Sequence, residues 1–191
     1  MRSDAREKRA ALIAATWDLF ALHGPDVPLR TVAAEAGVGI GTLYRHFPTR
    51  DDLVTGLIED IAERVVTIIR RYTDGWDGTW GTWRSFVHEI ADLKLAALAG
   101  QTVAVTPVDS PVWVDTEPLR RRFLAAYRGI LDLAADCGFV EPGLTAWRFH
   151  LGVAAVSRPM PERAESFAPG QAEWLVDTFI TGLAGSSAPR G

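Results

Sequence analysis

The stretch from residue 37 to residue 50, GVGIGTLYRHFPTR, concentrates side chains that hydrogen-bond to phosphate groups. The donors are hydroxyl, imidazole and guanidinium groups on Thr42, Tyr44, Arg45, His46, Thr49 and Arg50. Such groups supply most protein contacts to a nucleic-acid backbone, and arginine also reads base edges. This stretch is therefore predicted to form a surface that contacts a polyanion.

Three glycines determine how these donors are held. A glycine costs about 1 kcal/mol relative to alanine inside a helix. Gly37 is expected to end one helix in the left-handed conformation, which glycine adopts readily. Gly39 is expected at the N-cap of the next helix, where glycine costs only a few tenths of a kcal/mol relative to serine. Gly41 then lies in the first turn, where a bare backbone can approach a ligand closely.

Two short helices joined by a tight glycine turn make a helix-turn-helix, whose second helix enters the DNA major groove. The apolar spacing predicts helices over 4–23, 28–36, 39–46 and 49–72. Arg30 and Thr31, early in the second helix, are further candidates for DNA contact. Thr49 is expected to cap the fourth helix, whose free N–H groups can also receive a phosphate.

The period remains helical in the rest of the chain, so the fold is predicted to be all-α. Helices are expected over 79–99, 116–135, 144–157 and 169–184, and a proline-rich loop from residue 158. Residues 101–115 stay ambiguous, because Pro107 and Pro111 interrupt them. No internal repeat and no set of strands is evident. The predicted division is a DNA-binding domain over 1–50 and an effector-binding and dimerisation domain over 51–191.

The charge is unevenly distributed. The net charge of the chain is −4, composed of +2 over residues 1–50 and −6 over residues 51–191. A weakly basic head on an acidic body is compatible with a local contact to DNA. The single cysteine, Cys137, excludes an internal disulfide and suits a reducing cytoplasm. No apolar run is long enough for a signal core or a membrane span, so we expect a cytoplasmic protein without a membrane partner.

The segment LRTVAAEAGVGIGTLYRHFPTRDDL strongly resembles the TetR family of bacterial transcriptional regulators, whose pattern is roughly vrdIAeaAGVsxGTLYxHFxsKexL. The likeness covers about residues 8–55. It implies a homodimer that binds double-stranded operator DNA through a three-helix N-terminal unit. It also implies a larger helical domain that binds a small effector and dimerises.

The chain departs from this pattern at four positions. Gly39 replaces a serine, Pro28 replaces a threonine, Arg50 replaces a lysine, and Ile40 stands where a polar residue is common. Ile40 can touch a thymine methyl but cannot read a hydrogen-bond pattern. Base reading is therefore expected to fall on Arg30, Ile40, Gly41 and Arg45. The DNA-contacting set implied by the resemblance is Arg30, Thr31, Gly39, Ile40, Gly41, Thr42, Tyr44, Arg45, His46, Thr49 and Arg50.

No catalytic signature is visible in residues 51–191. The segment HEIAD begins like the zinc-protease motif HExxH, but Asp92 occupies the place of the second histidine. The four histidines are scattered, so no metal cluster is expected, and no cofactor is expected either. An enzyme on a helical scaffold would require converging titratable residues, and the sequence offers none.

The aromatic residues of the second domain have two possible roles. A tryptophan at helical spacing is usually core, yet helical ligand pockets are also lined by apolar and aromatic groups. The family resemblance places a pocket among the middle helices. The candidates are Trp83, Val87, Ile90, Trp113, Phe123, Tyr127 and Trp147. They favour an uncharged or weakly polar molecule, although Arg120, Arg121 and Arg122 add a charged run that we interpret as a solvated face.

The last two predicted helices mix small and large residues on one face, which would let two helices from each subunit pack together. The candidate dimer residues are Phe149, Val153, Val156, Trp174, Thr178, Phe179 and Gly182. The alternative is that these faces close the core of one subunit, and the family resemblance favours the dimer. The sequence thus predicts a repressor that is released from a palindromic operator by a small apolar ligand. Its rival is a helical ligand-binding protein whose DNA-binding head does not function.

Overall fold

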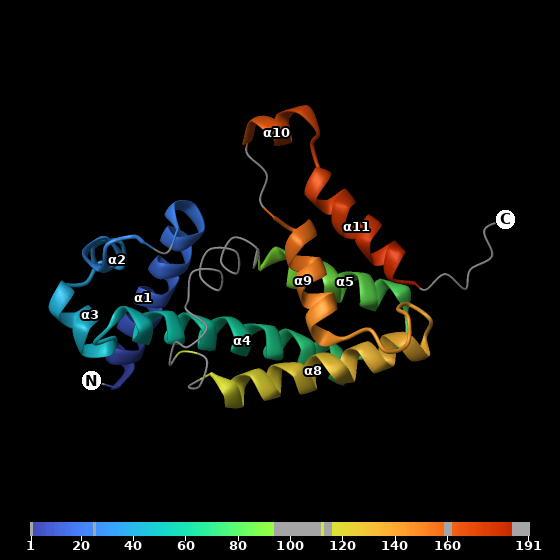
Figure 1. Cartoon of the computed structure of the whole chain (residues 1–191), viewed down its shortest axis with the longest axis horizontal. Helices are drawn as coiled ribbons and strands as arrows, with labels where there is room; N and C mark the ends of the chain where they lie inside the picture. The colour runs from blue at the N-terminus through green and yellow to red at the C-terminus, as the bar shows by residue number, and fades with distance from the viewer. Residues whose placement is uncertain (1, 25, 94–111, 113–115, 159–161, 185–191) are drawn as a thin grey trace. The chain divides into compact units, whose positions relative to one another are not determined.

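The protein is described by a computed structural model that covers residues 2–24, 26–93, 112, 116–158 and 162–184 (Figure 1). Within these ranges the chain forms α-helices and no strand, which confirms the all-α prediction. The helices are α1 (Arg2–His23), α2 (Leu29–Glu35), α3 (Ile40–His46), α4 (Arg50–Asp74), α5 (Trp80–Asp92), α8 (Glu117–Asp136), α9 (Ala146–Val156), α10 (Glu162–Phe167) and α11 (Gln171–Leu183).

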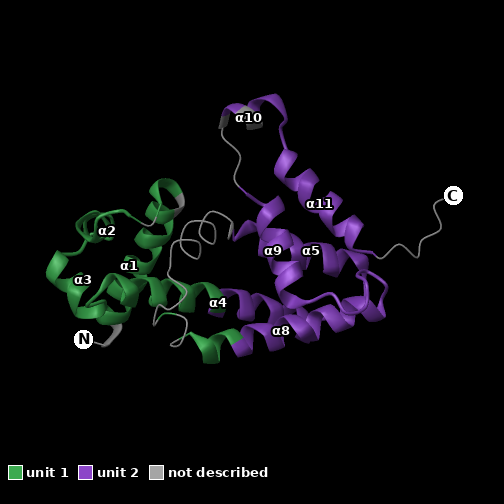
Figure 2. Cartoon of the chain, viewed as in Figure 1, with its two compact units in different colours: residues 1–62, 97–120 green, residues 63–96, 121–191 purple. Residues whose placement is uncertain are grey.

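The chain divides into two compact units (Figure 2). Unit 1 contains residues 1–62 and 97–120, and unit 2 contains residues 63–96 and 121–191. The change of unit falls inside α4 and inside α8, so both helices belong to both units. A functional boundary between residues 50 and 51 stays a prediction, because compactness alone does not separate DNA binding from effector binding.

The turn between α2 and α3 follows from its glycines. Gly37 has φ = 67°, a left-handed conformation that confirms its expected role at the end of α2. The N–H of Gly37 donates to Ala34 O at 3.0 Å, and that of Val38 donates to Ala33 O at 2.9 Å. These two bonds form a Schellman motif, which satisfies carbonyls that the end of the helix would otherwise leave free.

The start of α2 differs from the prediction by one residue. Pro28 was expected in the first helical turn, but it lies at the N-cap with an extended backbone (φ −61°, ψ 135°). Its carbonyl accepts from the N–H of Thr31 at 2.8 Å, so the helix begins at the next residue. The proline ring fixes only φ, and φ near −65° suits either position.

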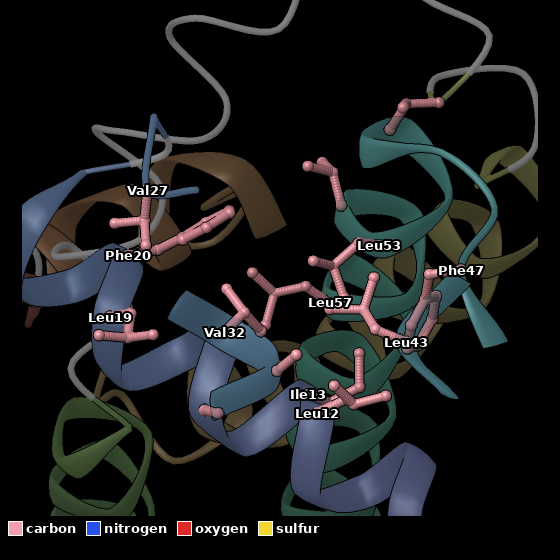
Figure 3. Close-up of a cluster of buried hydrophobic side chains, with 14 residues drawn as sticks. Leu12, Ile13, Leu19, Phe20, Val27, Val32, Leu43, Phe47, Leu53 and Leu57 are labelled. Carbon is pink, nitrogen blue, oxygen red and sulfur yellow. The ribbon is translucent and has the colours of Figure 1, made fainter. Parts of the chain in front are cut away.

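The core of the N-terminal three-helix unit is apolar and closed (Figure 3). Leu12, Ile13 and Phe20 enter it from α1, and Leu53 and Leu57 enter it from α4. The remaining buried members include Leu19, Val27, Val32, Leu43 and Phe47. Each buried aliphatic or aromatic side chain contributes about 1.5–3 kcal/mol. The short helices α2 and α3 are therefore stabilised by this core, since isolated helices of their length do not persist in water.

Gly56 marks the closest approach of α4 to the end of α3. A Cβ at this glycine would lie 2.7 Å from Cε1 of Phe47 and 3.3 Å from an Arg9 Nη2. The Arg9 guanidinium also lies over the Phe47 ring, 5.3 Å from its centroid, and pairs with Glu59 at 3.2 Å. α1, α4 and the residue that ends α3 are thus in mutual contact at one point.

In unit 2, α5, α9 and α11 pack on one another. Thr79 and Thr145 cap α5 and α9, each through a side-chain oxygen that accepts a backbone N–H. Gly152 of α9 lets α11 approach closely, because a Cβ there would lie 2.6 Å from two ring carbons of Phe179. α5 ends at Asp92 instead of the predicted 99, since the Leu93 N–H bonds three residues back to Ile90 O and closes the last turn.

A charged cluster joins α5 to α11. The Arg84 guanidinium donates to both carboxylate oxygens of Asp177, at 2.7 and 2.8 Å, and also to Glu173 at 3.2 Å. His88 Nε2 lies 2.8 Å from the same Asp177 carboxylate. The hydrogen bond from Arg84 is the main reason that the pKa of Asp177 falls to about 2. A bidentate pair of this kind fixes orientation as well as distance.

The prediction for the segment after α9 is wrong. It was expected to be a proline-rich loop, but residues Glu162–Phe167 form the short helix α10. The prolines at 161 and 169 flank this helix and do not interrupt it, which explains why proline content alone gave the wrong answer.

Candidate DNA-binding site

α3 presents one buried face and one exposed face. Leu43 is fully buried, and Phe47, which follows the helix, is nearly so. Gly39 caps the helix with an extended backbone (φ −71°, ψ 147°), as predicted. The residues of the predicted DNA-contacting set that are exposed are Arg30, Thr31, Gly39, Ile40, Gly41, Tyr44, Arg45 and Thr49. The buried side chains thus hold the helix while its other face stays open to a partner.

The exposed face begins with little side-chain bulk. Ile40 is 42% exposed, and neither Gly39 nor Gly41 has a non-local atom within 4 Å of where a Cβ would stand. Tyr44, one turn further along, is 50% exposed. The N-terminal end of α3 therefore presents an open backbone, and the contacts of this backbone with bases and of Tyr44 with a phosphate stay predictions.

Three members of the predicted set, Thr42, His46 and Arg50, are half-buried. The Arg50 guanidinium donates from Nη2 to the carbonyl of Val27 at 2.6 Å. This bond ties the start of α4 to the turn that precedes α2. Phosphate contact by Arg50 stays a prediction, and the structure gives the side chain a positioning role that sequence reasoning did not find.

The first turn of α4 is closed by a reciprocal cap, which bears out the role expected of Thr49. The Thr49 hydroxyl accepts from the Asp52 N–H at 3.1 Å, and the Asp52 carboxylate accepts from the Thr49 N–H at 2.8 Å. Asp51 and Asp52 also place negative charge at the positive end of the helix dipole.

Gly41→Ala is expected to keep the fold and weaken DNA binding. The open space around Gly41 accepts a methyl group, and the helix gains up to about 1 kcal/mol of stability. The methyl group would nevertheless hold the backbone away from the bases. Gly81→Ala is the matched control, because Gly81 occupies the same second position of α5 and is also uncrowded. Thermal unfolding and gel shift on both variants would check this; unchanged DNA affinity in Gly41→Ala would contradict it.

The residues predicted to line an effector pocket lie in the aromatic core of unit 2. Trp83, Val87, Ile90, Phe123 and Tyr127 are buried, and Trp147 is 44% exposed. Trp113 lies outside the described residues. Ring contacts connect three of the set: Phe123 lies 4.9 Å from Tyr127 and 5.5 Å from Trp147 between centroids. Phe149 links Tyr127 to Trp83, at 5.6 Å from each. The structure therefore brings Trp83, Phe123, Tyr127 and Trp147 into one aromatic cluster, whereas Val87 and Ile90 are buried on the helix that carries Trp83.

Tyr127 and His150 form a buried polar pair inside this core. The Tyr127 hydroxyl lies 2.9 Å from His150 Nδ1. Burial lowers the pKa of His150 to about 4 and raises the pKa of Tyr127 above its usual value. The phenol therefore keeps its proton and the imidazole is neutral, and one hydrogen bond joins the two groups.

Trp83 carries the one buried side-chain polar atom without a hydrogen-bond partner in the described part of the chain. Its indole Nε1 is shielded from solvent, and the side chain is fully buried. A buried donor without an acceptor costs about 1–3 kcal/mol. Tryptophan N–H groups in protein cores usually have a partner, so this atom is unusual.

A cleft of about 290 Å³ lies elsewhere in unit 2, between α4 and α8. Its lining residues are Ile69, Arg70, Thr73, Asp74, Arg122, Ala125, Ala126 and Gly129. None of them belongs to the predicted pocket. The charges of its lining are mixed, because Arg122 pairs with Glu63, and Arg70 and Asp74 are four residues apart on α4. The cleft therefore offers no clear preference for an ion.

The residues predicted for a dimer interface divide into two groups. Phe149 and Val153 are buried within the chain, whereas Trp174 is 59% exposed and Thr178 and Gly182 are exposed. Val156 and Phe179 are half-buried. Trp174, Thr178 and Gly182 are spaced by four residues, so they form one stripe along α11. On α9, Trp147 and Leu151 are both exposed and are also four residues apart.

The described residues contain no group of three or more histidine, cysteine or acidic side chains placed to hold a metal ion. No helix in the described ranges is long and apolar enough to cross a membrane.

The geometry of α2, the glycine turn and α3, supported by α1 and α4, defines a helix-turn-helix protein. A family model, "Bacterial regulatory proteins, tetR family", matches residues 12–57. The chain is 31% identical over 96 residues to a helix-turn-helix transcriptional regulator of Staphylococcus aureus strain USA300. This match covers 50% of the chain and 52% of that protein, so the chain spans about half the length of the curated relatives it matches.

Solved structures extend the likeness over nearly the whole chain. A TetR transcription regulatory protein from Mycobacterium vanbaalenii is 27% identical, with a TM-score of 0.66 over 96% of this chain and 99% of that one. The TetR-like regulator LfrR from Mycobacterium smegmatis, in complex with proflavine, is 23% identical, with a TM-score of 0.68 over 93% and 94%. The chain therefore matches the TetR family over residues 12–57, and its fold is similar to that of TetR-family transcriptional regulators.

Proposed function

We propose that this chain is a repressor that binds a palindromic operator as a homodimer and is released by a small apolar molecule. The observation that carries the proposal is the exposed face of α3, which is held by buried Leu43 and presents Ile40, Gly41 and Tyr44. Each subunit would place α3 in a major groove, with the two grooves about one helical turn (~34–36 Å) apart. The site of action would be the cytoplasm, where the DNA is.

The roles of the DNA-contacting residues follow from their positions. Arg30, Ile40 and Gly41 would face the bases, since they lie in the exposed first turns of α2 and α3. Arg45 would reach the bases from the exposed last turn of α3. The others would hold the backbone: Thr31, Gly39, Thr42, Tyr44, His46, Thr49 and Arg50. A head with so few side-chain donors at its tip would draw part of its specificity from apolar contact and DNA shape.

The effector is proposed to bind among Trp83, Val87, Ile90, Phe123, Tyr127 and Trp147, with Trp113 as a further candidate. These side chains are mostly apolar, and the Tyr127–His150 pair is neutral. An uncharged ligand suits such a lining, because burying an unpaired charge is costly. The proflavine complex of LfrR supports effector binding on this fold, although it does not indicate which molecule this chain prefers.

The dimer is proposed to form through the exposed stripe of α11 and the adjoining face of α9. Trp174, Thr178 and Gly182 would contact the second subunit directly, with Val156 and Phe179 at the margin. Phe149 and Val153 would support this surface from beneath, since they are buried within one chain. Small and large residues mixed along one stripe allow close helix packing.

Tyr44→Phe and, separately, His46→Ala test the DNA-binding assignment. Each loses one hydrogen bond to a phosphate, so affinity should fall by about 2–10-fold on every DNA sequence tested. Gel shifts with a specific site and with an unrelated duplex would measure both factors. If either variant changes the order of sequence preference, that residue contacts bases and its assigned role is wrong. A chain with a non-functional head would bind neither duplex, before or after substitution.

A further inference from the structure

Trp83 carries a polar group, the indole N–H, that is buried without a hydrogen-bond partner in the described part of the chain. The indole lies on α5 with its ring centroid 5.5 Å from that of Phe86 and 5.6 Å from that of Phe149. Its Nε1 is shielded from solvent and has no acceptor among the described residues. If packing were the only requirement, a phenylalanine would fill most of this space without a buried donor.

We propose that the Trp83 Nε1–H group donates a hydrogen bond to the effector, and that the effector is an uncharged apolar molecule with an acceptor oxygen such as a ketone or ether. The inference rests on the proposed function and adds the chemical class of the ligand. Binding such an acceptor would satisfy the one buried donor that the protein leaves open.

The surroundings of Trp83 favour a neutral ligand. Phe149 lies between Trp83 and Tyr127, with its ring centroid 5.6 Å from both. Tyr127 and His150 already satisfy each other, and His150 is neutral because burial disfavours its charged form. No Asp, Glu, Lys or Arg side chain is buried in the described ranges. An ionised ligand would therefore have no opposite charge in this core.

The position of Trp83 would couple the entry of a ligand to the packing of the helices of unit 2. Phe86 and Phe149 lie against the indole and stack on each other, with an interplanar angle of 8°. Because Nε1 is shielded from solvent, an acceptor group can reach it only if side chains packed around the indole move, and two of the rings packed there belong to α5 and α9. Arg84, next to Trp83, is bonded to Asp177 of α11. A shift of α5 would thus be passed to the helix whose exposed stripe is proposed to form the dimer.

The test uses two probes with one skeleton, benzophenone and diphenylmethane, which differ in the carbonyl oxygen. Binding to the full chain would be measured by thermal shift and by titration. Benzophenone should bind the wild type about tenfold or more tightly than diphenylmethane, and the two should bind Trp83→Phe equally. Trp80→Phe is the control, since Trp80 lies on the same helix but is exposed, and it should keep the preference.

A second readout does not depend on a variant. In the 15N-labelled wild type, the Nε1–H resonance of Trp83 should move on titration with benzophenone and much less with diphenylmethane. The proposal is overturned if the wild type binds neither probe, if it shows no preference, or if the preference survives in Trp83→Phe. Operator binding without a probe is measured on the same preparations. If the wild type did not bind operator DNA, the proposed repressor function would be wrong. The role of Trp83 is decided separately, by whether the ketone binds more tightly than the hydrocarbon.

Discussion

Phe47→Ala is expected to lower the free energy of unfolding by about 3–5 kcal/mol and to remove DNA binding at ordinary temperature. The ring is 2% exposed and belongs to the core that holds α3. It fills the space that the missing side chain of Gly56 leaves on α4. It also lies under the Arg9 guanidinium. Truncation would leave a cavity at the one point where α1, α4 and the end of α3 meet.

Urea denaturation would measure the loss of stability of Phe47→Ala, and gel shift would measure DNA binding. Leu22→Ala is the control, because Leu22 is also an apolar residue of this unit but is exposed on α1. It should change stability by less than about 0.5 kcal/mol. A Phe47→Ala protein as stable as the wild type would contradict the packing assigned to this residue.

The second large effect is expected for Phe149→Ala, also about 3–5 kcal/mol, but in unit 2. Phe149 is fully buried, and its ring contacts those of Trp83, Phe86, Tyr127 and Phe179. These partners come from α5, α8 and α11, so the loss would loosen every helix packed around this ring. Dimerisation and effector binding should both weaken.

Tryptophan fluorescence during denaturation would measure the loss of stability of Phe149→Ala. Sedimentation would measure whether the proposed dimer is weakened. Phe167→Ala is the matched control, since Phe167 is an exposed phenylalanine on α10. It should leave the unfolding midpoint within about 1 °C if surface substitutions act as they usually do. Equal destabilisation by the two variants would mean that Phe149 is not at the centre of the unit.

Local chemistry made the DNA-binding head predictable from the sequence. Gly37 requires a left-handed backbone, and it ends α2 as expected. Gly39 lies at the N-cap of α3, where a glycine is tolerated, and Thr49 caps α4 through its hydroxyl group. These features depend on neighbours within a few residues, so residue type and spacing are sufficient. The apolar period similarly located α4, α5 and α8 to within a few residues, apart from the end of α5.

Contacts between distant segments were not predictable in this way. Nothing in the sequence near Arg50 indicates that it bonds to the Val27 carbonyl, 23 residues away. The close approach of Phe47 to Gly56 had one available signal, a glycine in the middle of a long helix, which is costly unless another group needs the space. No feature of the sequence indicated that the Trp83 nitrogen lacks a hydrogen-bond partner, because a tryptophan at apolar helical spacing is usually interpreted as a core residue.

Selection of fragmented genomic DNA by the purified chain would show whether the protein binds specific DNA sites as a symmetric dimer. We expect enrichment of a small set of sites, each with two inverted half-sites whose centres lie about one helical turn apart. The enrichment should disappear when Phe47→Ala replaces the wild type and should keep its sequence pattern, at lower yield, with Tyr44→Phe. A stable wild-type chain that enriches no DNA, or enriches sites without inverted half-sites, would show that the protein is not a dimeric operator-binding repressor.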